Sequence, residues 1–274
     1  MAARAKAPID TSKAPIRNKQ GYYVLHDGTP LLSVTNVIDK GVPKDLVGWA
    51  TWEVAKLAVD SVPQLVRLRG QQARNEMVTW LKGASDRVRD AAGSFGSAIH
   101  DVAEAKVLGK PTAEPTEAQT PFIEAFENFV ADHQPVFHAT ELTVAHPEHG
   151  WAGRCDAWAE LPFTGEGICC IDYKTGKSAY PSAALQMSAY QRATVGWLDD
   201  GTEVKPPESV RSYVLHIRPD KHPDRGYALI PADTSDEVYE FFRHAQRIAE
   251  WCMSREKKAL GKPVVVPAVA EEVA

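Results

Sequence analysis

The hydrophobic pattern of the first third of the chain is mainly helical. Residues 44–60, KDLVGWATWEVAKLAVD, carry apolar side chains at helical spacing, and residues 63–90 continue as one or two helices. Ahead of them, GYYVLHDGTPLL predicts a small hairpin around Asp27–Gly28. Two further helices are expected, from about Ser94 to Leu108 and from about Thr116 to His133.

The pattern then changes to strands. Three strands are expected at Val136–Ala145, Trp151–Leu161 and Gly167–Lys174, a helix at Pro181–Leu198, two strands near Val210–Ile217 and Gly226–Ile230, and a last helix that ends at about Lys257. Proline suits the first turn of the Pro181 helix, and Thr234 with Glu237 has the spacing of a capping box. This order of elements predicts an α/β core with a mixed sheet flanked by helices.

The predicted organisation is one domain between two loose ends. Residues 1–19 carry five basic residues against one acid and form a flexible basic arm. Residues 20–258 form the domain, with a helical N-terminal part at 20–92 and the α/β core at 93–258. Residues 259–274 lack periodicity between their prolines and form a loose tail.

Composition and charge restrict the function only in part. The chain is 44% hydrophobic and 24% charged, as in a soluble globular protein, and its net charge of −5 provides no global basic field. Residues 63–90 nevertheless contain six basic residues against three acids, which fits either a solvated helix face or one wall of a nucleic-acid groove. No membrane span and no signal-peptide segment are found, so we expect a cytoplasmic protein.

Three local patterns resemble binding sites but do not fit them. The four cysteines lack CxxC spacing and are expected to be reduced and mostly buried (Cys155, Cys169, Cys170 and Cys252). Residues 175–178, TGKS, resemble the end of a phosphate-binding loop, but that motif needs glycine where Ile171 stands. His146–Pro147–Glu148–His149 favours a turn between strands over a zinc site.

The stretch ICCIDYKTGK, residues 168–177, carries the candidate chemistry. Its apolar run predicts a buried strand. Burying an acid and an amine at the end of that strand costs desolvation free energy, which indicates that these two residues have a role. Asp172 and Lys174 share one face of the strand, and Tyr173 points to the other. Lys174 is then an ammonium group positioned for a reacting water or a developing negative charge.

The preceding strand places a second acid beside the first. If the two strands pair as a hairpin, the carboxylates of Asp156, in GRCDAW, and Asp172 can converge. Close carboxylates repel each other, and a divalent cation between them removes the conflict; oxygen ligands suit magnesium or manganese. The sequence therefore predicts a metal site at this hairpin.

Further polar residues have the right order to join that site. His100 lies on the helix before the sheet, with Glu104 one turn later, and Glu141 lies on the first strand, facing either solvent or the site. Gln186 and Tyr190 are four residues apart on a helix and can reach one patch of substrate.

Each of these residues also has a simpler explanation. An acid and a lysine at a strand end commonly form an exposed ion pair, and a helical histidine is more often hydrogen-bonded than metal-bound. Asp156 fits a surface acid, and Gln186 with Tyr190 fits the polar edge of an amphipathic helix. Their joint order on helix, strand, strand and helix favours a site.

The ordered set GSAIH, GRCD, IDYKTGK and QMSAY resembles the RecB-like exonuclease branch of the PD-(D/E)XK nuclease superfamily, of the phage and CRISPR-associated type. The resemblance covers roughly residues 21 to 200. It implies the restriction-endonuclease-like core of that superfamily and metal-dependent hydrolysis of DNA from an end, with DNA as the partner. A single-strand annealing protein or a helicase is a further partner that the family suggests.

The resemblance also assigns roles to residues. His100, Asp156, Asp172 and the backbone carbonyl of Tyr173 would hold one or two magnesium or manganese ions, and Lys174 would act in catalysis. Gln186 and Tyr190 would lie along the DNA, and Glu141 aligns with a frequent catalytic acid. Cys155 stands where the superfamily name expects proline, and the cysteines do not match the iron–sulfur pattern of some members, so no cluster is expected.

Two other functions compete with the exonuclease. The first is a structure- or site-specific endonuclease with the same core, which would cut closed circular DNA as well as linear DNA. The second is a catalytically silent module that binds DNA ends. Retention of His100, Asp156, Asp172 and Lys174 together argues against the silent module.

Overall fold

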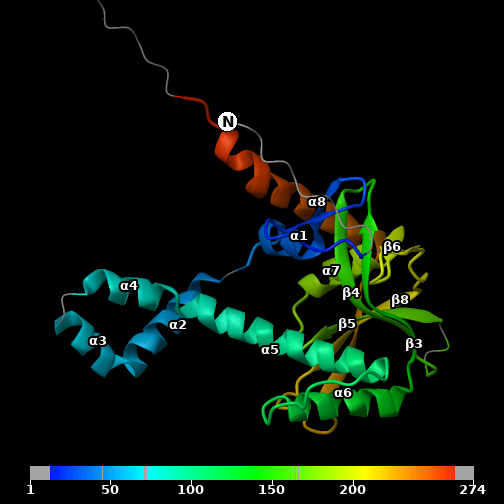
Figure 1. The fold of residues 1–274 in the computed structure, drawn as a ribbon, viewed down its shortest axis with the longest axis horizontal. Helices are drawn as coiled ribbons and strands as arrows, with labels where there is room; N and C mark the ends of the chain where they lie inside the picture. Colours follow the sequence, from blue (N-terminus) through cyan, green and yellow to red (C-terminus); the bar gives the residue numbers. More distant parts are fainter. Residues whose placement is uncertain (1–12, 45, 71–72, 164, 166, 263–274) are drawn as a thin grey trace, which may run out of the picture.

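A mixed β-sheet forms the centre of the fold (Figure 1). The structure is a computed structural model that describes residues 13–44, 46–70, 73–163, 165 and 167–262. Its strands are β1 (Tyr22–Val24), β2 (Pro30–Ser33), β3 (Val136–His146), β4 (Trp151–Glu160), β5 (Ile168–Lys174), β6 (Val195–Trp197), β7 (Glu203–Val204), β8 (Arg211–Ile217) and β9 (Tyr227–Ala232). They lie in the order β7-β6-β3-β4-β5-β8-β9, with β2 parallel to β4 and antiparallel to β1. Because β5 and β8 are also parallel, the sheet is mixed.

Helices cover both faces of this sheet. They are α1 (Val34–Gly41), α2 (Val47–Asp60), α3 (Val62–Gly70), α4 (Arg74–Lys82), α5 (Ala84–Val107), α6 (Thr120–His133), α7 (Ser182–Tyr190) and α8 (Asp236–Glu250), which continues into a π-helical turn (Trp251–Arg255) and a 3₁₀ turn (Glu256–Lys258). One core joins α1, α7 and α8 to the sheet around the buried Trp151 and Trp158. The other joins α5 and α6 around Phe126 and Phe129. The predicted α/β class, with a mixed sheet and flanking helices, is confirmed.

The long strands match their predicted positions to within about two residues. β5 is buried along its whole central part, which explains its continuous apolar run ICCI. Cys170 belongs to the core beneath α7, whereas Ile171 and Tyr173 belong to the core beneath α6, so successive side chains alternate between faces. The predicted hairpin around Asp27–Gly28 is also present, as β1 and β2.

The helix predicted at Pro181–Leu198 is shorter than expected. It ends at Tyr190, and Val195–Trp197 forms β6, which pairs antiparallel with β3. The change begins where the Thr194 amide donates to the Ala145 carbonyl instead of a helical one. An unpaired edge of β3 would leave backbone groups unsatisfied, and the β-branched Thr194 and Val195 suit a strand.

Other boundaries also differ from the sequence prediction. The capping box at Thr234 and Glu237 is wrong, because Ser235 is the N-cap of α8 and no side chain caps that helix. The helices expected at 63–90 and 94–108 are divided differently, since α5 runs without a break from Ala84 to Val107. Glycine at position 96 lets α5 approach the sheet closely: a Cβ there would lie 3.1 Å from Thr175 Oγ1.

The segment expected to be a helical N-terminal part contributes to the core. Within residues 20–92, β2 pairs with β4, and α1 packs against α8. Part of the basic arm that was expected to be flexible also contacts the body: Arg17 pairs with Tyr23 and donates to the Asn36 side chain. Residues 1–12 of the arm and 263–274 of the expected tail lie outside the described residues.

The helices α2, α3 and α4 project from the sheet, and we call them the spur (Figure 1). None of them contains a buried residue. The spur is joined to the body through α5, whose second half packs against α6 through Ile99 and Val102 and joins the core of the sheet through Ala103. Among the described helices, none combines the length and the apolar character that crossing a bilayer requires.

Candidate active site

The site forms where β4 and β5 separate. Their antiparallel pairing ends at Ala157 and Ile171, one residue before Asp156 and Asp172. Past this point the Asp156 carboxylate replaces a backbone acceptor: its Oδ2 accepts a hydrogen bond of 2.6 Å from the Tyr173 amide. The predicted hairpin of the two acidic strands is thus present, and the end of its ladder directs the Asp156 side chain inward.

Three potential ligands gather beside this split, and we call them the trio. One ligand atom from each of His100, Glu141 and Asp156 lies within 4.8 Å of the other two. His100 Nδ1 is 3.5 Å from Asp156 Oδ1 and 3.7 Å from Glu141 Oε1. No other set of three such side chains comes this close in the part of the chain that the structure describes. The trio joins helix α5 to strands β3 and β4.

Glu141 reaches the trio through an irregular backbone. Its neighbours on β3 pair with Ala157 and Cys155 on β4, so Glu141 lies opposite Asp156, although that pair is not itself bonded. Its φ of +49° is rare for a residue with a side chain, and such strain often accompanies functional positions. Arg154 Nε holds it in place, at 2.7 Å from the Glu141 carbonyl oxygen and 2.9 Å from Oε2.

A proton on His100 takes part in neutralising the two acids of the trio. Burial lowers the pKa of His100, but the carboxylates of Asp156 and Glu141 outweigh burial and raise that pKa from 6.5 to about 10. Burial raises the pKa of Asp156, yet His100, Lys174 and the Tyr173 amide together lower it. The imidazolium proton therefore occupies the place where a metal ion would neutralise the two acids. One imidazole and two carboxylates fit manganese better than magnesium, because imidazole favours softer ions.

The second half of the site holds a lysine instead. Asp172, whose side chain is 1% exposed, lies with Oδ2 at 2.5 Å from Lys174 Nζ. Its other oxygen, Oδ1, accepts a hydrogen bond of 3.0 Å from Gln186 Nε2 on α7. We call Asp172, Lys174 and Gln186 the lysine group. Each charge in it has a partner, so it needs no added cation to be stable.

Burial and neighbouring charges tune the lysine group. Burial raises the pKa of Asp172, Lys174 opposes that rise and Asp156 adds to it, and the result is a pKa of about 6 in place of 3.8. Burial lowers the pKa of Lys174, but the charges of Asp172 and Asp156 outweigh burial and raise it. At neutral pH the lysine therefore remains an ammonium group beside an ionised aspartate.

The α7 residues singled out in the sequence meet this group. Gln186 Nε2 is also 3.2 Å from Tyr190 Oη, so the two residues share a hydrogen bond along the helix. Tyr190 is buried against Gly153 of β4, where a Cβ would lie only 2.6 Å from the tyrosine ring. In the structure Gln186 therefore holds Asp172, while Tyr190 is mostly a core residue.

Sequence reasoning missed the residues that hold the loop after Lys174. His216 lies opposite Lys174 on the parallel strand β8, and its Nε2 is 2.9 Å from the Gly176 carbonyl oxygen. Arg218 Nη1 donates to the Thr175 carbonyl oxygen at 3.2 Å. The sequence does contain a pattern that could have indicated them. His216 on β8 and Arg218 directly after it are two residues apart, so both side chains lie on one face of the extended chain. Arg154, two residues before Asp156, was missed in the same way.

The structure brings most of the predicted site residues together, but in two groups. His100, Asp156 and Glu141 form the trio, so the face of Glu141 that the sequence left open is the site face. Asp172 does not belong to the trio, although it was expected to share a cation with Asp156. Tyr173 contacts the trio in two ways. Its backbone amide donates a hydrogen bond to Asp156, and its ring lies edge-on to His100 with centroids 5.6 Å apart.

The simpler readings of two other motifs are consistent with the structure. His146 to His149 form the turn between β3 and β4, and the two imidazoles stack with centroids 3.7 Å apart rather than gathering with a third ligand. Of the four cysteines, three are buried and Cys252 is exposed, and none of them forms a disulfide bond within the described residues.

In comparisons with known proteins, no family model matches this chain and no curated protein matches it at a significant level.

Proposed function

We propose that this protein is a metal-dependent deoxyribonuclease of the RecB-like, PD-(D/E)XK type, acting as an exonuclease on DNA ends. The single observation that carries the proposal is the adjacency of a trio of potential metal ligands and a buried aspartate paired with a lysine at the split of β4 and β5. Hydrolysis of a phosphodiester needs positive charge beside an anionic phosphate and a group that manages protons. The site offers both within one small region.

The trio would hold a divalent cation, with manganese or magnesium as the candidates. A bound ion of this kind supplies positive charge to phosphate oxygens and lowers the pKa of a coordinated water. His100, Glu141 and Asp156 provide the donors, and Arg154 keeps Glu141 turned toward them. Tyr173 supports the trio from the other side, because its amide fixes Asp156 and its ring packs against His100.

The lysine group would act on the phosphate directly. Lys174 presents an ammonium group that donates hydrogen bonds to non-bridging oxygens and stabilises the charge that develops on them. Asp172 keeps that ammonium in place at 2.5 Å, and Gln186 prevents Asp172 from turning away. His216 and Arg218 hold the loop that follows Lys174, which limits how far the lysine can move.

The endonuclease remains the alternative within the same class, since the site chemistry is identical. The motif order resembles end-directed enzymes of phage recombination and repair, and this resemblance favours the exonuclease. A single-strand annealing protein or a helicase is the kind of partner that such an enzyme would have.

The test is cleavage of end-labelled linear DNA with manganese or magnesium. The wild type should release labelled nucleotides, whereas Asp172→Ala and Lys174→Ala should each abolish cleavage, a loss of at least about 1,000-fold, because Lys174→Ala removes a transition-state contact and Asp172→Ala releases the lysine that makes it. Lys174→Ala should retain DNA binding. Closed circular DNA, which has no ends, should resist the wild type.

Two outcomes would contradict this proposal. Cleavage at a near wild-type rate by either purified variant would remove the catalytic role of the lysine group. Absence of cleavage by the wild type on single-stranded and double-stranded linear DNA with both metals would favour the end-binding module. Labels on the 5′ and the 3′ end in separate reactions also report the direction of hydrolysis.

A further inference from the structure

The spur carries a charge bias that its packing does not explain. The spur, residues 47–82, contains five basic and three acidic residues, a net charge of +2, whereas the rest of the chain has 26 basic and 33 acidic residues, a net charge of −7. Six basic residues lie in 63–90, four of them in α3 and α4 and two near the start of α5. No residue of α2, α3 or α4 is buried, so the core of the protein places no demand on these side chains. A solvated helix face needs charge but does not need one sign of charge.

The basic residues at the tip of the spur are unneutralised. Arg89 pairs with Asp86 and Asp90, and Arg87 lies over the Trp80 ring, so those two have local partners. The other four are exposed and form no ion pair with any residue in the described ranges (Arg67, Arg69, Arg74 and Lys82). Three of them, which we call the tip cluster, lie in the last turn of α3 and at the start of α4: Arg67, Arg69 and Arg74.

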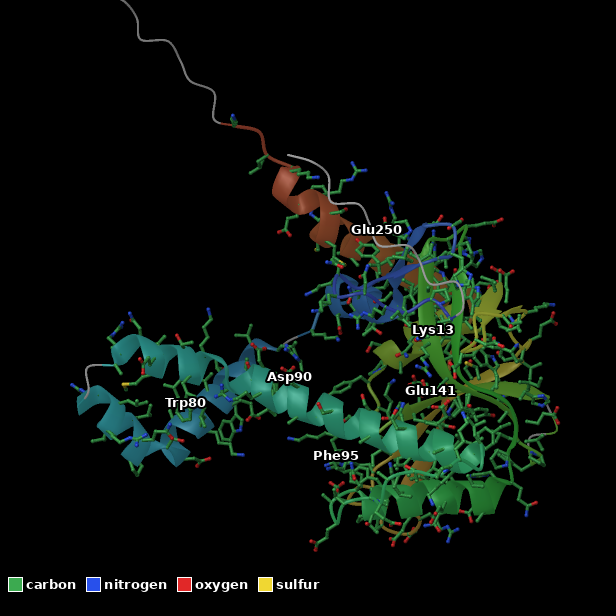
Figure 2. The ribbon with its side chains drawn as sticks, in the orientation of Figure 1. Lys13, Trp80, Asp90, Phe95, Glu141 and Glu250 are labelled. Atoms are coloured by element: carbon green, nitrogen blue, oxygen red, sulfur yellow. The ribbon has the colours of Figure 1, made fainter. Side chains whose placement is uncertain are left out.

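The spur and the candidate active site share one rigid element. Helix α5 begins at Ala84 beside the spur and carries His100 of the trio. Figure 2 shows its course: Trp80 lies in the spur, Asp90 and Phe95 follow along α5, and Glu141 lies on the sheet. The 16 residue steps between Ala84 and His100 correspond to about 24 Å of helix. The helices α3 and α4, which carry the tip cluster, lie farther from the sheet than α5 does (Figure 1).

We propose that the tip cluster binds the phosphate backbone of the same DNA whose end is at the active site. This proposal rests on the proposed function and specifies where the substrate runs. Each nucleotide of duplex DNA advances about 3.4 Å along the axis, so 24 Å corresponds to roughly seven base pairs. The spur therefore contacts DNA at least that far from the reacting phosphate. The tip cluster contacts phosphates and not base edges, and phosphate contacts carry no sequence information.

Charge complementarity selects DNA over a second copy of this chain. Most exposed apolar side chains of the spur lie on α2 and the first half of α3, and one lies on α4 (Val47, Trp52, Val59, Val62, Val66 and Val78). The tip cluster instead places three positive charges at the end of α3 and the start of α4. A partner that covers the tip must supply negative charge. The phosphates of a substrate already bound at the trio do so without any additional component.

The experiment measures DNA binding without metal, so that no cleavage takes place. The variant Arg67→Gln/Arg69→Gln/Arg74→Gln is compared with the wild type on hairpin DNA with a stem of about 24 base pairs. Loss of three phosphate contacts should reduce the slope of log affinity against log salt by about 2.5 to 3 and weaken binding about tenfold or more at low salt. On a stem of about six base pairs, roughly 20 Å long, the variant should bind like the wild type.

A matched control removes equal charge from another place. Arg255, Lys258 and Lys262 are exposed and lie after α8, far from the spur, so their triple glutamine variant should bind both hairpins nearly as the wild type does. Thermal unfolding checks that both triple variants are folded. Because all six side chains are exposed, neither variant should lose stability.

The outcomes separate this inference from the nuclease proposal. An unchanged salt slope, an equal loss on both stems, or an equal loss in the control variant would overturn it. A change from dimer to monomer in sedimentation, with DNA binding unaltered, would overturn it in favour of self-association. If the wild type fails to cleave DNA but shows the length-dependent loss, the spur binds DNA and the nuclease proposal fails alone.

Discussion

The two halves of the candidate site contain similar acids, but the positive charges that neutralise these acids differ. In the lysine group, Asp172 has an ammonium partner and an amide donor, and its charges are balanced. In the trio, Asp156 and Glu141 share His100, whose pKa rises to about 10 between them, and Glu141 also pairs with Arg154. The comparison teaches that the trio has the donors for a metal ion, which would replace the proton on His100, whereas the lysine group already holds its own cation. The proposed metal contact and the proposed phosphate contact are therefore assigned to different residues.

Metal affinity gives the largest expected difference between the halves. Asp156→Asn removes a direct ligand and should weaken manganese binding by about 100-fold or more, whereas Asp172→Asn, which alters a neighbour of the site, should weaken it by about tenfold at most. Both variants can be measured by titration calorimetry at neutral pH without DNA. Equal losses would mean that Asp172 moves to become a ligand when metal binds, as the sequence predicted.

The pH dependence of metal binding should sharpen the same comparison. The folded-state pKa of His100 is raised, so its charge stabilises the metal-free protein fully below about pH 6.5, and this contribution is lost as the pH rises through about 10. A metal ion needs the neutral imidazole and must displace this proton. Manganese affinity should therefore rise up to about tenfold per pH unit between about pH 6.5 and 8.5.

Calorimetry in buffers of different ionisation enthalpy counts the displaced protons. We expect about one proton released per ion by the wild type and none by His100→Gln. A manganese affinity that does not change across this pH range would show that His100 is already neutral. The raised pKa of His100 would then be wrong.

Substitution of Gly153 gives the smallest expected effect, and it perturbs only the lysine group. In Gly153→Ala the new Cβ would lie 2.6 Å from the Tyr190 ring, so the ring must shift, which should destabilise the fold by about 1–3 kcal/mol. Displacement of Tyr190 also removes its hydrogen bond to Gln186. Manganese affinity should not change, because the trio keeps its ligands.

The matched control is Gly93→Ala on the exposed half of α5. A Cβ there has no atom within 4 Å, and alanine in a helix is favoured over glycine by about 0.5–1 kcal/mol. Chemical denaturation should therefore show opposite signs for the two glycine-to-alanine changes. Stabilisation by Gly153→Ala would mean that Tyr190 is not packed against β4 as described.

Much of the fold could be predicted because local patterns decided it. The buried run of β5 and the apolar spacing of α8 are properties of consecutive residues, and both elements occur close to where they were expected. β6 could not be predicted, because Val195 leaves the helical path only to pair with Ala145 of β3, which lies 50 residues earlier in the chain. The capping of α8 also failed, since Thr234 and Ser235 are both acceptable caps and the tertiary path selects one.

The sequence by itself determined that Asp172 and Lys174 lie on one face of β5 and Tyr173 on the other, because side chains alternate along a strand. Only the tertiary structure decided how the site residues divide. The end of the β4–β5 ladder turns Asp156 toward His100, and the left-handed backbone of Glu141 completes the trio. Strand separation and backbone strain depend on contacts between distant segments, and no periodicity in a single segment encodes them.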